Sequence, residues 1–176
     1  MKNIVLIGFM GTGKTSTGKL LASRLGYAFV DLDHRIEAEN HMTIQDMFAQ
    51  HGEAYFRSCE TTMVKKMAAR QQLVISTGGG TVKNPANMEM LRKNGIIVSL
   101  TADVDTILQR TGRRGTRPVL DQQDQGNRRQ AVVELLTERR ALYEQADYIL
   151  DTSRLSPLQV AEAIVRLLKK GGAVHA

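Results

Sequence analysis

Short apolar runs alternate along the chain with longer segments in which apolar residues recur at helical spacing. The apolar runs predict strands at residues 3–7, 27–32, 73–76, 96–100 and 148–150. The segments between them predict helices at residues 14–25, 33–40, 43–50, 53–70, 84–93, 103–110, 128–145 and 157–169. Because strands and helices alternate, we expect an α/β domain in which a parallel sheet is covered by helices on both faces.

Glycines and aspartates gather where three of the predicted strands end. Residues 8–15, GFMGTGKT, follow the first strand, Asp31 and Asp33 close the second, and residues 78–80, GGG, follow the third. Ligands of parallel α/β sheets bind at the carboxyl ends of the strands. We therefore expect one ligand site at this edge, built from three separate segments of the chain.

Residues 8–15 have the spacing of a phosphate-binding Walker A loop, between a strand and a helix. Glycine allows the backbone to adopt positive φ and to approach a phosphate closely. Successive N–H groups and the start of the next helix then form an anion site. Lys14 is expected to reach the β- and γ-phosphates of a nucleotide, and the Thr15 hydroxyl to ligate Mg²⁺. A glycine-rich turn that only opens a helix is the alternative, and the complete pattern argues against it.

Asp31 and Asp33 are candidates for the acceptor side of a phosphoryl transfer. They lie two residues apart in a segment that we expect to be extended, so both side chains leave one face and Leu32 points into the core. One carboxylate could hold Mg²⁺ through water while the other touches an acceptor hydroxyl. Asp33 could instead cap the helix that follows, and spacing alone leaves both interpretations open.

Arg57 precedes Glu60 by three residues on a predicted helix. Such a pair is commonly a solvated ion pair. If Arg57 and Arg139 met in the fold, however, they would offer two planar guanidinium groups to a carboxylate. The three glycines of residues 78–80 indicate that a ligand lies against bare backbone.

Composition and charge narrow the classes of protein. The chain has 176 residues, 42% of them apolar, which suits one globular domain over residues 1–176. No apolar run is long enough to span a membrane, and the run before Gly8 is interpreted as a strand and not as a signal peptide. The one cysteine, Cys59, excludes an internal disulfide and favours a reducing cytosol. The chain carries a formal charge of +6. Its basic residues are not interleaved with aromatic residues, as a surface that binds single-stranded nucleic acid would require. Basic loops that face a polyphosphate therefore explain the charge better.

Residues 112–126 lack periodicity and are rich in arginine. A phosphoryl-transfer enzyme excludes water by closing a mobile segment, and we expect this one to be such a lid. Arg117, next to Pro118, is the candidate for a contact with the transferring phosphoryl group. Arg113 and Arg114 are expected to be solvated loop charges.

Six motifs, taken in order, resemble the shikimate kinase family and cover nearly the whole chain: GFMGTGKTSTGKLLA, FVDLDHRIE, IQDMFAQHGEAYFRSCE, VISTGGG, RTGRRGTRPVL and ERRALYEQAD. The resemblance implies a three-layer P-loop kinase fold of the nucleoside-monophosphate-kinase type, with a five-stranded parallel sheet and a mobile lid. It implies a cytoplasmic monomer that uses ATP and Mg²⁺ to convert shikimate into shikimate 3-phosphate, on the route to chorismate and the aromatic amino acids.

The resemblance also implies roles for individual residues. ATP would be bound by Gly11, Thr12, Gly13, Lys14, Thr15, Ser16, Arg110, Arg117 and Arg154, with Arg110 and the loop at residues 154–157 flanking the adenine, and Mg²⁺ by Thr15 with Asp31. The acceptor-binding helical region would span about 33–60, and shikimate would be bound by Asp33, Arg57, Gly78, Gly79, Gly80 and Arg139. The catalytic residues would be Lys14, Asp33 and Arg117, with Asp33 orienting or deprotonating the 3-hydroxyl.

Two other functions compete with this interpretation. Another small kinase of the same fold would act on gluconate or a nucleoside monophosphate, but no sequence feature supplies the pocket that a nucleotide base needs. A basic, ATP-regulated nucleic-acid-binding module would explain the charge, yet it has no motif support. We therefore expect ATP and shikimate as partners, without nucleic acid or membrane.

Overall fold

The protein, described by a computed structural model over residues 1–112 and 127–173, contains one parallel sheet. The strands of the described residues are β1 (Asn3–Ile7), β2 (Ala28–Asp31), β3 (Leu73–Ser76), β4 (Gly95–Thr101) and β5 (Tyr148–Asp151), in the order β2-β3-β1-β4-β5. Every neighbouring pair is parallel, and Val5 of the central strand pairs with Ile75 and Ile97. The five-stranded parallel sheet that was predicted is confirmed.

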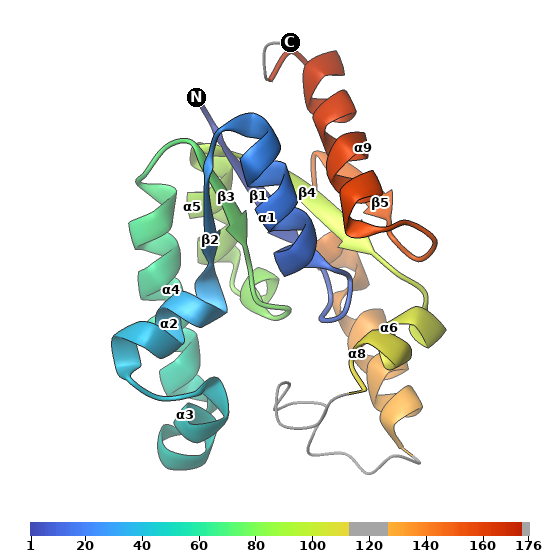
Figure 1. Ribbon diagram of the computed structural model, residues 1–176. Coiled ribbons are helices and arrows are strands. Elements are labelled where there is room, and N and C mark those ends of the chain that lie inside the picture. Colours follow the sequence, from blue (N-terminus) through green and yellow to red (C-terminus); the bar gives the residue numbers. More distant parts are fainter. Residues whose placement is uncertain (113–126, 174–176) are drawn as a thin grey trace.

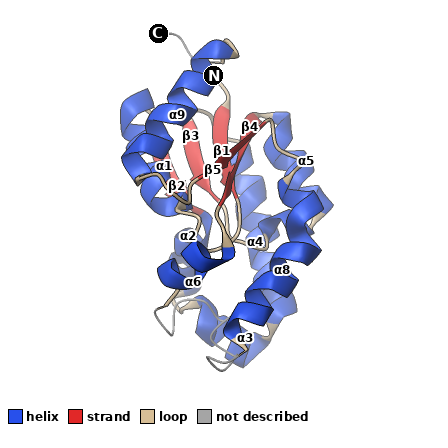
Figure 2. Ribbon diagram, turned by 90° about the vertical axis from the view of Figure 1, so that its right-hand side faces the viewer, coloured by secondary structure: helices blue, strands red, loops and turns tan. Residues whose placement is uncertain are grey.

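Helices cover both faces of this sheet (Figure 2). Their bounds are α1 (Lys14–Leu25), α2 (Leu32–Asn40), α3 (Ile44–His51), α4 (Glu53–Ala68), α5 (Pro85–Lys93), α6 (Val104–Arg110), α8 (Arg128–Tyr143) and α9 (Pro157–Lys170), and a 3₁₀ helix spans Thr81–Lys83. One face carries α1 and α9, and the other carries α4, α5 and α8. The expected three-layer arrangement is confirmed.

The two faces of β1 bury two separate apolar clusters. Val5 and Ile7 pack with α4, α5 and α8, whereas Ile4 and Leu6 pack with α1 and α9. Every residue of β1 is buried, because a central parallel strand lies between two helical layers. This accounts for the uninterrupted apolar run in the sequence and fixes the loop that follows Ile7 at the carboxyl edge of the sheet.

The start of α2 departs from the prediction. We expected residues 31–33 to be extended, but only Asp31 is, and α2 already begins at Leu32. Asp31 caps this helix, since the backbone N–H of His34 donates to Asp31 Oδ1 at 3.2 Å. The capping role considered for Asp33 therefore belongs to Asp31, and Asp33 lies in the first turn. Leu32 is fully buried, as expected.

The helices beyond the carboxyl ends of the strands frame the place where a ligand is expected. Figure 1 shows α2 and α3 on one side of these strand ends and α6 and α8 on the other. Residues 113–126, which hold most of the predicted lid and its Arg113, Arg114 and Arg117, lie outside the described residues. No helix in the described ranges is both long enough and apolar enough to cross a membrane.

Candidate active site

A pocket of about 420 Å³ lies at the carboxyl ends of the strands. It is lined by residues 10–17, Asp31, Asp33, residues 77–79, Arg110, Thr152, Leu155, Pro157 and Val160. The loop after β1, the end of β2 and the glycines after β3 thus meet in one cavity. The sequence predicted this convergence from the positions of the strand ends.

The loop after β1 is wrapped around a lysine. Gly11 and Gly13 have φ angles of 82° and 91°, a left-handed conformation that favours glycine. Gly13 caps α1, and the side chain of Lys14 turns back so that Nζ donates to the carbonyls of Gly8 at 2.7 Å and Phe9 at 2.9 Å. The ammonium group is therefore held inside the loop, where phosphate-binding lysines are needed.

The threonines and the serine of this loop differ in what they contact. Thr12 is buried, and its hydroxyl donates to the Phe9 carbonyl at 2.8 Å, so the side chain stabilises the loop itself. Thr15 and Ser16 are exposed. Thr15 Oγ1 donates to Asp31 Oδ2 at 2.8 Å, which places a hydroxyl and a carboxylate from two strand ends together. Oxygen ligands of this kind suit Mg²⁺.

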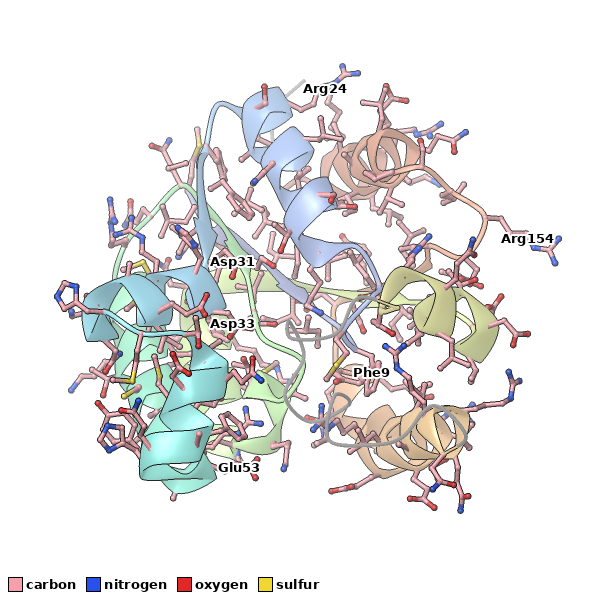
Figure 3. All side chains as sticks on the ribbon, turned by 60° about the horizontal axis from the view of Figure 1, so that its bottom comes forward. Phe9, Arg24, Asp31, Asp33, Glu53 and Arg154 are labelled. Carbon is pink, nitrogen blue, oxygen red and sulfur yellow. The ribbon has the colours of Figure 1, made fainter. Side chains whose placement is uncertain are left out.

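Asp33 carries the strongest electrostatic perturbation in the pocket. Its Oδ1 is buried and has no hydrogen-bond partner among the described residues. Burial, followed by repulsion from the carboxylates of Glu60 and Asp31, raises the pKa of Asp33 to about 7, against the opposing effect of Lys14. Figure 3 shows Asp31 and Asp33 at the end of β2 and the start of α2. Asp33 is thus a carboxylate that can take up a proton near neutral pH.

Glu60 is a site residue that the sequence interpretation missed. Its side chain is 1% exposed and accepts a hydrogen bond from Thr81 Oγ1 at 2.8 Å. It also pairs with Arg57, whose Nη1 lies 3.0 Å from Glu60 Oε1. The alternative interpretation, an ion pair exposed to solvent, is therefore wrong, because the Glu60 side chain is buried. The helical spacing of the sequence could have predicted this burial, because Glu60 lies on the same face of α4 as the buried Phe56 and Met63.

The three glycines after β3 do not share one purpose. A Cβ on Gly78 would lie 2.8 Å from Asp33 Oδ1, and a Cβ on Gly80 would lie 2.6 Å from Arg57 Nη2. Glycine at these two positions therefore leaves room for the side chains of Asp33 and Arg57. We had expected only that the glycines expose backbone to a ligand. Gly78 and Gly79 line the pocket, while Gly80 lies against Arg57.

Arg139 reaches the glycine segment from α8. Its side chain is buried, and its guanidinium lies 5.9 Å from the centre of the Phe9 ring. Neither Nε nor Nη1 has a hydrogen-bond partner in the described part of the chain. A buried guanidinium with unused donors is unfavourable unless an anion is bound. Arg139 thus marks a place for a negatively charged ligand group close to Gly79.

The two arginines predicted beside the adenine behave differently. Arg110 lines the pocket and donates to the Gly11 carbonyl at 3.3 Å and to the Thr152 carbonyl at 2.9 Å. Arg154 is exposed and extends away from the pocket (Figure 3). Its neighbours Leu155 and Pro157, which belong to the loop expected beside the adenine, line the pocket instead and give it an apolar wall.

Comparison with known proteins identifies the family of this chain. The family model described as shikimate kinase matches residues 10–169. The chain belongs to the shikimate kinase family. A shikimate kinase from Pelotomaculum thermopropionicum is 45% identical over 170 residues, which cover 97% of both chains. One from Thermodesulfovibrio yellowstonii is 46% identical over 166 residues, which cover 94% of both.

A solved structure of the family resembles the fold closely. Shikimate kinase from Acinetobacter baumannii in complex with shikimate matches with a TM-score of 0.92 and 38% sequence identity. The match covers 97% of this chain and 94% of that chain. The resemblance to the family seen in the sequence motifs is therefore confirmed at the level of both sequence and fold.

Proposed function

We propose that this protein transfers the γ-phosphate of ATP to the 3-hydroxyl of shikimate, giving shikimate 3-phosphate and ADP for the synthesis of chorismate and aromatic amino acids. Membership of the shikimate kinase family supports the reaction. The observation that carries the acceptor is a set of buried polar atoms without a partner among the described residues: Asp33 Oδ1 in the pocket, and Nε and Nη1 of Arg139 beside Gly79, which lines the pocket. A hydroxylated carboxylate offers a hydroxyl to the first and an anion to the second.

On the donor side, residues 11–16 would hold the triphosphate of ATP through backbone N–H groups. Lys14 would contact the β- and γ-phosphates, and its contacts with two loop carbonyls keep it in place. Arg110 would flank the nucleotide, with Leu155 and Pro157 supplying apolar surface, whereas Arg154 extends away from the pocket (Figure 3). Arg117, outside the described residues, would close on the transferring phosphoryl group.

The oxygen atoms of Thr15 and Asp31 fit a magnesium ion, because they converge to within 2.8 Å from two strand ends. When bound, Mg²⁺ would neutralise negative charge that develops on the phosphates during transfer. Asp31 also caps α2, so the same carboxylate group fixes the start of the helix that carries Asp33.

On the acceptor side, Arg57, Arg139 and the backbone of Gly79 would bind the carboxylate of shikimate. Gly78 and Gly80 would give Asp33 and Arg57 the room to reach it. The 3-hydroxyl oxygen would attack the γ-phosphorus while the bond to the leaving oxygen of ADP breaks. Asp33 would orient the hydroxyl and accept its proton, for which a pKa of about 7 is suited.

We further propose that residues 1–176 act as one domain, as a cytoplasmic monomer with small-molecule partners and without nucleic acid or membrane. The formal charge of +6 then serves the anionic substrates. Gel filtration tests the monomer. Binding to DNA or RNA that weakens steeply with salt would contradict the absence of nucleic acid.

The decisive experiment measures ADP formation from Mg·ATP alone and with shikimate, gluconate or AMP. We expect strong stimulation by shikimate only, with the phosphate of the product assigned to the 3-position by ³¹P NMR. ADP release that no acceptor stimulates would leave the phosphate loop standing and overturn the acceptor. Stimulation by gluconate or AMP instead would assign the protein to another kinase activity of this fold.

A further inference from the structure

One turn of α8 touches the glycine segment twice. Tyr143, the last residue of α8, is 6% exposed, and its hydroxyl donates to the carbonyl oxygen of Gly79. Arg139 lies four residues earlier, on the same side of the helix. Its Nη1 lies 3.6 Å from the position that a Cβ of Gly79 would occupy. A hydroxyl and a cation of one helix therefore converge on a single glycine.

The contact with Tyr143 constrains a whole peptide group. The carbonyl of Gly79 and the N–H of Gly80 belong to one planar trans peptide and point in opposite directions. When Tyr143 holds this carbonyl toward α8, the N–H of Gly80 is turned away from α8. A turn hydrogen bond from the N–H of Thr81 to the carbonyl of Gly78 spans this peptide. Glycine at both central positions of the turn still allows the peptide to rotate, so a contact from outside the turn can select its orientation.

Tyr143 is suited to be a permanent donor. Burial raises the pKa of its phenol above the usual value, so the hydroxyl keeps its proton throughout the neutral range. The other end of α8 is also tied down, since the guanidinium of Arg128 donates to the carbonyl of Thr111, just after α6. The helix that carries Arg139 is thereby anchored at both of its ends.

We propose that Tyr143 is a positioning residue that fixes the Gly79–Gly80 peptide relative to Arg139 and thereby sets how tightly the pocket holds the carboxylate of its acceptor. The inference rests on the proposed function, because it requires a carboxylate between Arg139 and the glycine segment. Tyr143 acts through Gly79 and through Arg139, whose side chain also interacts with its hydroxyl, and it takes no part in phosphoryl transfer itself.

The substitution Tyr143→Phe removes the hydroxyl and keeps the ring that packs in the core. Losing one such hydrogen bond should raise the KM for shikimate by about 3–10-fold. The kcat and the KM for ATP should stay within about twofold, because the chemistry and the donor site are untouched. Tyr148→Phe is the matched control, since Tyr148 stands on β5 beside Gly171 and lines no part of the pocket.

A second acceptor substrate distinguishes a positioning role of Tyr143 from a general loss of stability in the variant. Shikimate methyl ester has the same hydroxyls but no carboxylate, so the ratio of kcat/KM for the acid to that for the ester should fall about 3–10-fold in Tyr143→Phe. This ratio does not depend on how much of the variant is folded. An unchanged ratio, or an unchanged KM for shikimate, would overturn the inference. If the wild-type protein did not phosphorylate shikimate, the proposed function would fail independently of Tyr143.

Discussion

The two halves of the pocket are built on different principles. On the donor side, contiguous residues of one loop satisfy each other: Thr12 bonds Phe9, and Lys14 bonds Gly8 and Phe9. On the acceptor side, groups from α2, α4, α8 and the glycine segment lie next to one another, and two of them, Asp33 and Arg139, have buried polar atoms without a partner among the described residues. The donor half is built to bind phosphate groups through its backbone. The acceptor half instead contains side chains whose hydrogen-bonding atoms are left for the ligand.

This difference has an energetic side. The acceptor half buries Glu60 and brings Asp33 close to it and to Asp31, so three carboxylates share a small volume. Arg57 compensates for one of them through its 3.0 Å contact with Glu60. Burying unpaired charge is unfavourable. We therefore expect substitutions that remove charge from the acceptor half to lower activity and to raise the stability of the fold. Substitutions in the donor half should lower activity with little gain in stability.

Lys14→Ala is the strongest test of the donor half. It removes the charge on the β- and γ-phosphates, and we expect kcat/KM for ATP to fall by about 10²–10³-fold or more. The fold should persist, because the α1 C-terminal cap and both apolar clusters are untouched. Activity assays and thermal melts measure the two effects, with Lys19→Ala, on the exposed side of α1, as the control. Near-normal turnover would contradict the role of the loop.

Asp33→Asn should separate activity from stability in the acceptor half. Removing the proton acceptor should lower kcat by about 10²–10⁴-fold while ATP binding stays nearly normal. Calorimetric titration with ATP checks the second part, and Asp46→Asn on the exposed start of α3 is the control. A variant with near-normal kcat/KM would remove Asp33 from the mechanism.

The same substitution should stabilise the protein above neutral pH. Because folding raises the pKa of Asp33 from 3.8 to about 7, its contribution is fully present below pH 4 and is lost as the pH rises through 7. Asn carries no charge, so Asp33→Asn should be more stable than the wild type at pH 8 by about 1–4 kcal/mol. Denaturant unfolding at pH 4 and pH 8 measures this, and an equal difference at both values would contradict it.

Arg57→Ala tests whether the acceptor half recognises a carboxylate. Losing a charged hydrogen-bond donor should raise the KM for shikimate by about 10–100-fold, with a much smaller change in the KM for ATP. Arg35→Ala, on the exposed side of α2, serves as the control. An unchanged KM for shikimate would make Arg57 a purely structural partner of Glu53 and Glu60.

The contrast between the halves also explains what the sequence could predict. The sheet and the loop at residues 8–15 follow from local patterns, and β1, α1 and β3 have the predicted bounds. The acceptor half depends on contacts between distant segments. The burial of Glu60 requires Thr81, and the role of Tyr143 requires Gly79, 64 residues away along the chain. Residues 31–33 were misplaced because Asp31, by capping α2, starts the helix earlier than the alternation indicated.

The smallest expected effect concerns the pH dependence of the reaction. With Asp33 acting as the proton acceptor, kcat/KM for shikimate should rise with pH and level off above the pKa of about 7. Glu60→Gln removes a repulsive carboxylate but keeps an acceptor for the Thr81 hydroxyl. Since a nearby negative charge raises the pKa of Asp33, the midpoint of this rise should move to lower pH by about one unit or less.

Glu89→Gln, on the exposed surface of α5, is the matched control for Glu60→Gln, because it removes the same charge far from Asp33. Its profile should coincide with that of the wild type. A midpoint that moved in both variants would point to the net charge of the protein as the cause. A midpoint that stayed in place in Glu60→Gln would mean that burial alone raises the pKa of Asp33, and that the crowding of carboxylates is not what tunes the acceptor half.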